Sequence, residues 1–205
     1  MSVKELLENL MAEKAPGPTP SFTVFDLVKI LEIIAETRMI GRGRLSEKLG
    51  LGKGATRTLL ARLTDADLIS TSKGGCSLTE KGRKVWKDIK TVLPQKAILR
   101  KNELTFAPYN VAALVRGRSE NVKKGLEQRD AAVRAGSTGA TTLIFRDDKL
   151  VLPTISRDIA EAYPRAFRHI TSLMDLKDGD VVIIGCADQP REAEYGALAA
   201  AWTII

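Results

Sequence analysis

The side chains best suited to chemistry in the first half of the sequence are basic and hydroxyl groups on one predicted helix, residues 53–66. Lys53, Arg57 and Thr58 fall on the side of this helix that its leucines leave free. The guanidinium of Arg57 could donate two hydrogen bonds to O6 and N7 of a guanine, and Lys53 and Thr58 could hold phosphates. An ordinary solvated helix face is the alternative. The candidate DNA-binding residues are Arg44, Lys53, Ala55, Arg57, Thr58, Arg62 and Lys73.

Polar residues in the second half fall at the ends of predicted strands, where a small molecule could bind. The glycine-bounded run at residues 136–142 could cradle an anion with its backbone N–H groups, and an ordinary tight turn is the alternative. The run is not a P-loop, because the lysine and the glycine spacing of that motif are absent. Residues 127–130 lie inside a predicted helix, where a salt-bridged solvated face is the alternative. The candidate ligand-binding residues are Arg116, Ser119, Glu127, Arg129, Asp130, Thr141, Thr142 and Asp188.

Residue types that serve catalysis and metal binding do not occur in the required patterns. His169 is the single histidine, and no serine, cysteine or carboxylate pattern accompanies it, so we expect a structural role. Cys76 and Cys186 are widely separated and form neither a disulfide framework nor a metal-binding spacing. The sequence contains no nucleophile elbow and no pair of carboxylates suited to glycoside hydrolysis. We therefore expect no enzymatic activity, no metal and no cofactor.

The net charge of +7 lies entirely in the first half of the chain. Residues 1–100 contain 18 Lys and Arg against 11 Asp and Glu, whereas residues 101–205 contain 14 of each kind. This asymmetry predicts a polyanionic partner for the first half. Nucleic acid is favoured over an anionic membrane surface, because no basic helix carries a face of Trp or Phe. With no secretory signal and no apolar run of about 20 residues, we expect a cytoplasmic protein without a membrane partner.

The elements that must position the basic residues follow the order of a winged helix-turn-helix. Residues 1–20 form an arm whose short amphipathic helix ends at prolines within 16–20; the arm is either flexible or packs on a partner subunit. Residues 21–93 predict a long helix, a short helix, a glycine turn at 50–52, a second helix of the pair, a hairpin closed by a Gly-Gly pair, and a final helix. Such a module lays its second helix in the major groove of double-stranded DNA.

Thr23 and Asp26 have the spacing of a capping box for the long helix, whose core stripe is expected at positions 24, 27, 28, 31 and 34. Thr79 should cap the final helix, in which Trp86 is expected in a core or an interface. The inward side of the helix at 53–66 is expected to comprise Thr56, Leu59, Leu60 and Leu63.

The second half predicts a separate domain. Residues 94–104 are expected to form a linker, and residues 105–205 follow the order β-α-β-β-α-β-α, which indicates one sheet covered by helices. The predicted fold class is a two-domain α+β or α/β protein, with a winged helix-turn-helix followed by a single-sheet α/β domain. The apolar strand at residues 180–185 should lie at the centre of the sheet. Residues 159–174 should be mostly helical with a bend at Pro164, and the alanine-rich helix at 192–202 should pack on the sheet or on a twin subunit. We expect this domain to dimerise, to sense a small-molecule effector, or both.

Four segments carry a family resemblance: residues 50–54 (GLGKG), 74–82 (GGCSLTEKG), 127–143 and 180–185 (DVVIIG). Together they resemble a family of archaeal winged-helix proteins whose C-terminal domain has no assigned function. The resemblance extends over about residues 20–205, and its two C-terminal segments are the more specific, since winged-helix signatures are common. It implies a transcription regulator, and it supplies no ligand and no site residues.

These observations predict a cytoplasmic transcription regulator that binds double-stranded DNA as a homodimer. An unknown effector would change the spacing of the two recognition helices and so the affinity for DNA. One alternative is an enzyme that acts on a phosphorylated metabolite through its second domain. Another is an RNA- or ribosome-associated factor, although an aromatic content of 5% and the lack of a stacking platform disfavour single-stranded RNA.

Overall fold

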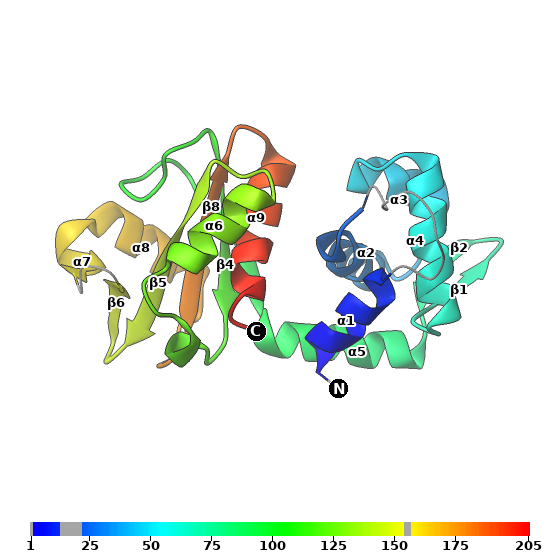
Figure 1. Cartoon of the computed structure of the whole chain (residues 1–205), viewed down its shortest axis with the longest axis horizontal. Helices are drawn as coiled ribbons and strands as arrows, with labels where there is room; N and C mark the ends of the chain where they lie inside the picture. Colours follow the sequence, from blue (N-terminus) through cyan, green and yellow to red (C-terminus); the bar gives the residue numbers. More distant parts are fainter. Residues whose placement is uncertain (1, 13–21, 154–156) are drawn as a thin grey trace. The chain divides into compact units, whose positions relative to one another are not determined.

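The computed structural model describes residues 2–12, 22–153 and 157–205, and the chain divides into two compact units. Unit 1 comprises residues 1–89 and unit 2 comprises residues 90–205. In the described residues, unit 1 consists of helices and one small hairpin, whereas unit 2 is built on a larger sheet (Figure 1). Among these residues, no helix has the length and the apolar composition that crossing a membrane requires.

Helix α1 (Val3–Met11) is part of the core of unit 1. Leu7 is fully buried, so the chain itself covers the apolar side of the helix. At the other end of α1, the guanidinium of Arg62 donates hydrogen bonds to the carbonyl oxygens of Leu10 and Met11, both at 2.9 Å. Neither predicted alternative, a flexible arm or packing on a partner subunit, therefore describes α1. The predicted proline break lies outside the described residues.

The core of unit 1 is formed mainly by the apolar sides of α2 (Val24–Thr37) and α4 (Lys53–Asp65). The capping box predicted at Thr23 and Asp26 is present, and the N–H of Thr23 donates to the Asp26 carboxylate at 2.7 Å. Helix α2 is buried around more of its circumference than the predicted stripe, because Ile30 is buried as well. The inward residues predicted for α4 are confirmed as buried: Thr56, Leu59, Leu60 and Leu63.

Local hydrogen bonds close the turn between α3 (Arg42–Leu49) and α4. Gly50 adopts a left-handed conformation with a φ of 62°, and its N–H donates to the carbonyl of Glu47 at 3.1 Å. The N–H of Leu51 donates to the carbonyl of Ser46 at 3.2 Å, and the Ser46 hydroxyl donates to the carbonyl of Leu51 at 2.6 Å. Because Leu51 is also buried, this short segment sets the direction in which α4 leaves α3.

The hairpin of β1 (Ile69–Ser72) and β2 (Gly75–Leu78) is attached to the helices along one edge. Strand β2 pairs with β1 on one side and with Ile40 on the other. The N–H of Cys76 donates to the carbonyl of Ile40 at 2.8 Å, and the N–H of Ile40 donates to the carbonyl of Cys76 at 3.0 Å. A Cβ at Gly75 would lie 2.5 Å from the Ile40 oxygen, so glycine is required for this approach.

Helix α5 (Glu80–Val92) closes unit 1 and runs past the division between the units. The hydroxyl of Thr79 accepts a hydrogen bond from the N–H of Gly82 at 2.9 Å, which confirms the predicted cap. Gly82 lies directly against the segment before the hairpin, where an added Cβ would be 1.9 Å from the carbonyl oxygen of Leu68. Trp86, which we expected in a core or an interface, is half-buried.

Unit 2 contains a six-stranded sheet in which each pair of neighbouring strands is antiparallel. The strands, in order across the sheet, are β3 (Gln95–Ile98), β4 (Tyr109–Val115), β8 (Val181–Ala187), β5 (Gly139–Arg146), β6 (Lys149–Leu152) and β7 (Arg157–Asp158). Strand β8 lies between β4 and β5, which confirms the central position predicted for it. The antiparallel pairing selects the α+β alternative of the predicted fold class.

Part of the predicted linker at residues 94–104 belongs to this sheet. Strand β3 begins directly after Pro94 and pairs with residues 111–114 of β4. The linker prediction is therefore wrong for residues 95–98. The physical reason is that the short strand is stabilised by a partner further along the chain, which a local pattern does not reveal.

Helices cover both faces of the sheet (Figure 1). α6 (Leu126–Arg134) and α9 (Pro190–Trp202) lie on one face, and the alanine-rich α9 packs on the sheet, the first of its two predicted positions. A Cβ at Gly185 would lie 2.4 Å from the carbonyl oxygen of Ala193, so glycine allows α9 this close approach. The core cluster between α9 and the sheet consists of two alanines of the helix and three strand residues: Ala193, Ala197, Val111, Ala113 and Ala187. The larger apolar core lies on the other face, beneath α7 (Ile159–Ala162) and α8 (Pro164–Leu173).

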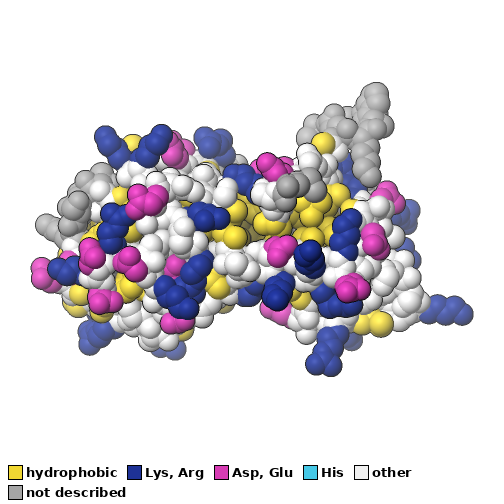
Figure 2. All heavy atoms as spheres, turned by 90° about the horizontal axis from the view of Figure 1, so that it is seen from below, with side chains coloured by type: hydrophobic (Ala, Val, Ile, Leu, Met, Phe, Trp, Pro, Cys, Tyr) yellow, Lys and Arg dark blue, Asp and Glu magenta, His cyan; other side chains and the backbone are white. Residues whose placement is uncertain are grey.

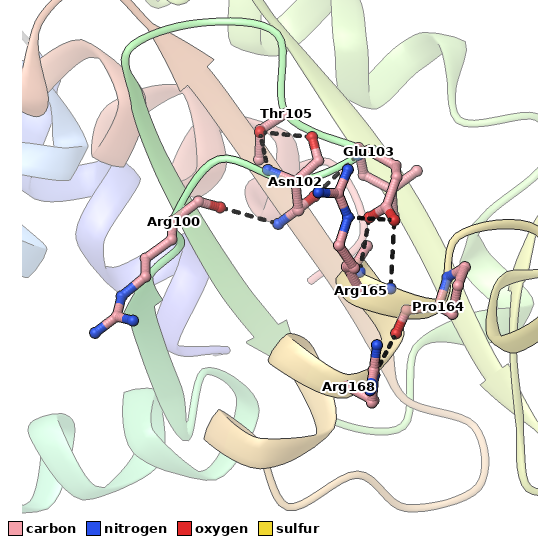
Figure 3. Close-up of polar contacts among 9 residues, drawn as sticks. Arg100, Asn102, Glu103, Thr105, Pro164, Arg165 and Arg168 are labelled. Atoms are coloured by element: carbon pink, nitrogen blue, oxygen red, sulfur yellow. Dashed lines mark hydrogen bonds and ion pairs between the residues drawn. The ribbon is translucent and has the colours of Figure 1, made fainter.

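The loop between β3 and β4 caps the N-terminus of α8 through Glu103 (Figure 3). The carboxylate of Glu103 accepts hydrogen bonds from the N–H of Ala166 at 2.9 Å and from Nε of Arg165 at 3.0 Å. Partial burial raises the pKa of Glu103, but these donors outweigh it, so the pKa lies below its ordinary value. The helix predicted with a bend at Pro164 is two helices, because this proline occupies the first position of α8.

Replacing Gly82 by alanine should destabilise unit 1 by about 1–3 kcal/mol or more, because the added methyl group overlaps the backbone at Leu68. Gly54→Ala is the matched control, since a Cβ at Gly54 meets nothing within 4 Å and alanine favours a helix by up to about 1 kcal/mol. Urea unfolding followed by circular dichroism measures both variants. Equal stability of the two variants would contradict the close packing of α5.

The lowered pKa of Glu103 predicts a pH-dependent contribution to the stability of unit 2. The contribution is complete above the ordinary pKa near 4.5 and disappears as the pH falls through the lower pKa of the folded state. Glu103→Gln should therefore lower the thermal midpoint at neutral pH, and the difference from the parent should shrink as the pH falls through the lowered pKa of the folded state. Glu161→Gln, on the exposed side of α7, is the control. A difference that persists unchanged into acid would refute the role of the charge.

Candidate nucleic-acid interface

The outward side of α4 carries the central predicted residues. Lys53, Arg57 and Ala61 follow one another at four-residue spacing, and all three are exposed, opposite the buried leucines. Lys53 and Arg57 make no hydrogen bond or ion pair with the part of the chain that the structure describes. Thr58 lies beside them, and its hydroxyl donates to the carbonyl of Gly54 at 3.2 Å. This face therefore presents two cationic groups to a partner.

The first turns of α3 and α4 differ from those of the other helices of unit 1. The first turns of α1, α2 and α5 each contain an acid, respectively Glu5, Asp26 and Glu80. In contrast, α3 and α4 begin after glycines, Gly41 and Gly52, which supply no side-chain cap, and neither first turn contains an acid. Neither a capping side chain nor a first-turn acid thus balances the positive end of these two helix dipoles.

Basic side chains occupy these same two turns. Arg42 and Arg44 are in the first turn of α3, Lys53 is the first residue of α4, and all three are exposed. Arg42 was not among the predicted residues, although its place directly after a glycine at a helix start is visible in the sequence. The two helix ends combine the partial positive charge of free N–H groups with full positive charges.

Arg62 does not belong to the interface that the sequence predicted. Its guanidinium is used by the carbonyls at the end of α1 and lies 5.4 Å from the centre of the Phe22 ring. The helix carbonyls carry partial negative charge, which makes them suitable partners for a guanidinium.

Ala55 is half-buried, so it offers little surface to a partner. Lys73 is exposed in the two-residue turn of the hairpin.

The surface of the molecule is of mixed charge when viewed from one side. Figure 2 shows Lys and Arg side chains projecting separately, with Asp and Glu side chains between them. The case for an anionic partner therefore depends on the specific helix ends of unit 1, and net charge alone does not identify the binding surface.

The structure assigns Arg116 and Ser119 to structural roles. The guanidinium of Arg116 pairs with the fully buried carboxylate of Asp180 at 2.5 Å and donates to the carbonyl of Asp175. Asp180 also accepts hydrogen bonds from the N–H groups of Gly117 at 3.1 Å and Lys177 at 2.8 Å. Ser119 is buried beside this network. The guanidinium of Arg116 is thus used inside unit 2, and the ligand role of these two residues stays a prediction.

The predicted anion cradle at residues 136–142 is a structural turn. The N–H groups of Gly136 and Ser137 donate to carbonyls at the end of α6, and that of Thr138 donates to the carbonyl of Cys186. The hydroxyl of Ser137 also donates to the carbonyl of Cys186, at 2.6 Å. From Gly139 onward the chain pairs with β8. Because these donors are used inside the protein, the tight-turn alternative is correct.

The other ligand-binding candidates lie on α6, on β5 and directly after β8. Glu127 pairs with Lys123 at 3.7 Å, and Arg129 pairs with Asp130 at 2.9 Å, all on exposed surface, as the solvated-face alternative predicted. Asp188 is exposed directly after β8. In β5, Thr141 is half-buried, while Thr142 is buried with a hydroxyl that has no partner in the described residues.

Each unit also contains one cysteine thiol. Cys76 and Cys186 are both buried and unbridged. Burial raises the pKa of each thiol, which keeps both protonated and poorly nucleophilic at neutral pH. In the part of the chain that the structure describes, no cluster of three metal-ligating side chains occurs. The helix ends of unit 1 are thus the best-formed candidate site.

Comparisons with known proteins cover both units. Residues 24–84 match the PH0730-like N-terminal domain, and residues 106–204 match a domain of unknown function, DUF4443. No curated protein matches the chain significantly. The solved structure of the hypothetical protein PH0730 from Pyrococcus horikoshii OT3 is 30% identical in sequence, with a TM-score of 0.73 over 90% of this chain and 93% of that chain. Identity at this level over nearly the full length of both chains shows that this chain belongs to the PH0730-like family.

Proposed function

We propose that unit 1 is a winged helix-turn-helix that binds double-stranded DNA, and that the protein is a cytoplasmic transcription regulator. The observation that carries the proposal is the pair of helix starts in α3 and α4, where free N–H groups coincide with Arg42, Arg44 and Lys53. The order of elements supports it, because two helices joined by a tight turn are followed by a two-stranded hairpin and a further helix.

Electrostatic self-repulsion at these helix starts is the physical reason for expecting phosphate as the partner. A cation near a helix N-terminus opposes the helix dipole, at a cost of about 0.3–1 kcal/mol. In α1, whose first turn also contains Lys4, and in α2, capping boxes with Glu5 and Asp26 supply a negative charge at the helix start. A phosphate oxygen placed at either start would accept hydrogen bonds from backbone N–H groups and neutralise the basic side chains together. Binding would thus remove a destabilising feature of the free protein.

The dimensions of α4 suit the major groove. Its 13 residues span about 20 Å, and its outward stripe has no large apolar side chain that would resist the polar groove. Arg57 lies one turn inside the helix from Lys53, so phosphate contact by Lys53 would leave Arg57 over base edges. Lys73, at the turn of the hairpin, would contact the backbone beside the groove. A homodimer with unit 2 as the dimerisation domain remains part of the proposal, since a single module makes few contacts.

Two arginines of α4 provide a matched test. Arg57→Ala should weaken binding to a duplex selected from random DNA by about 1–3 kcal/mol and relax the preference at one base pair, with no change in the thermal midpoint. Arg62→Ala should do the reverse: it removes the hydrogen bonds to α1 and lowers the stability by about 1 kcal/mol or more, while affinity stays near that of the parent.

Fluorescence anisotropy measures affinity, differential scanning calorimetry measures stability, and sedimentation of the complex gives the number of chains per duplex. If the affinity of Arg57→Ala equals that of the parent, α4 is not the recognition helix. Sedimentation showing one chain bound tightly would remove the dimer. Tighter binding to a structured RNA competitor would favour the RNA-associated alternative.

The hairpin contact predicts a change in salt dependence. Lys73→Ala should weaken binding to all duplex sequences alike and lower the slope of log affinity against log salt concentration by about 1, because one fewer phosphate is neutralised. Lys123→Ala, which removes an exposed charge from unit 2, should leave the slope unchanged. Titrations at several potassium chloride concentrations measure both variants. An unaltered slope for Lys73→Ala would place the hairpin away from the DNA.

A further inference from the structure

A cavity of about 690 Å³ lies in unit 1, between α2, β2 and α5. The C-terminal part of α2 contributes Ile34 and Ala35, β2 contributes Leu78, and α5 contributes Trp86. Ile34 and Leu78 are buried, so they form an apolar base, and Trp86 is half-buried. A volume of this size is typical of sites for small organic molecules, which are mostly apolar with a few polar groups that set orientation.

The polar groups at this cavity are chiefly two guanidinium groups, those of Arg38 and Arg83. The lining residues in the described part of the chain include no Asp or Glu, so neither charge is neutralised within the cavity. Arg38 makes no hydrogen bond or ion pair with the described residues. A cavity with an apolar base, an aromatic wall and two cationic groups matches a molecule with an apolar body and one anionic group.

The side chain of Arg83 is held by a backbone carbonyl, and Arg38 starts from an unusual backbone conformation. Nη1 of Arg83 donates to the carbonyl of Leu78 at 2.9 Å, which leaves its other N–H groups available. Arg38 ends α2 with φ of 62° and ψ of −40°, a conformation that a residue with a side chain rarely adopts. It lies two residues before Ile40, whose backbone pairs with Cys76 of β2. Strand β2 thus lines the cavity and is also one of the two strands of the hairpin.

We propose that this cavity is an effector site for a small apolar or aromatic molecule that carries one anionic group, such as a carboxylate. The site lies in unit 1, whereas the sequence suggested unit 2 for a sensor. An occupant held between Arg38 and Arg83 contacts both the end of α2 and β2, so it biases the hairpin that carries Lys73. This second statement rests on the proposed DNA binding; the binding of the small molecule does not.

Two isosteric probes test the site without DNA. 1-Naphthoate and 1-naphthamide share the apolar body, and only the first carries a charge. Isothermal titration calorimetry on the full chain should show one saturable site for 1-naphthoate, with affinity about tenfold or more above that of 1-naphthamide. In Arg38→Gln and in Arg83→Gln this preference should shrink, and in the double variant it should disappear. Arg134→Gln, an exposed arginine of α6, is the control for charge.

A second variant tests the cavity without changing any charge. Ala35→Phe fills the space and should abolish binding of both probes, whereas Ala61→Phe, on the exposed side of α4, should not affect binding. Thermal midpoints near that of the parent establish that the variants are folded. Undiminished binding of 1-naphthoate to folded Ala35→Phe would overturn the site, and so would the absence of saturable binding to the parent.

The coupling to DNA is tested separately. Saturating 1-naphthoate should change the affinity of the parent for its selected duplex by about fivefold or more, and the duplex should change the affinity for 1-naphthoate by the same factor. Ala35→Phe should remove both effects. Binding of the probe with an unchanged duplex affinity would overturn the coupling and leave the site. Binding of the probe by a protein that binds no duplex would overturn the proposed function and leave the site.

Discussion

The backbone pair between Ile40 and Cys76 is the constraint on which the functional surfaces of unit 1 depend. It joins the segment before α3 to the hairpin that follows α4, so the two ends of the helix pair are tied together through two hydrogen bonds. Gly75 permits the approach, and the packing of Gly82 on the segment at Leu68 holds α5 against the base of the same hairpin. Without this edge, the hairpin would be an isolated two-stranded ribbon, which has little stability in water.

Some helix ends of unit 1 have side-chain partners for their backbone groups, and two helix starts have none. α1 and α2 begin with complete capping boxes, and the carbonyls that end α1 are bound by Arg62. α3 and α4 begin with glycine and cations instead. Proteins often break the local rules of capping and charge at the sites where they bind a partner. The repulsion at these helix starts is therefore the observation on which the proposed binding of an anionic partner depends.

Unit 2 shows the opposite arrangement, because the polar groups that sequence reasoning selected are mostly satisfied within the fold. Arg116 and Asp180 neutralise each other beside the start of β8, and the N–H groups of the turn before β5 bond to neighbouring carbonyls. Such networks fix the ends of the strands and rigidify the sheet. The candidate effector cavity lies in unit 1, beside the hairpin.

Local spacing in the sequence was sufficient to predict the helices and hairpin of unit 1, the buried side of α4 and the central position of β8. The reason is that amphipathic periods, caps and glycine turns are set by residues close together in the chain. It also placed Arg57 and Lys53 on the exposed side of α4. The sequence did not reveal that Arg62 binds α1, that residues 95–98 join the sheet, or that Arg38 and Arg83 share a cavity. Each of these depends on residues that are distant along the chain, and only the packed structure decides which groups a side chain meets.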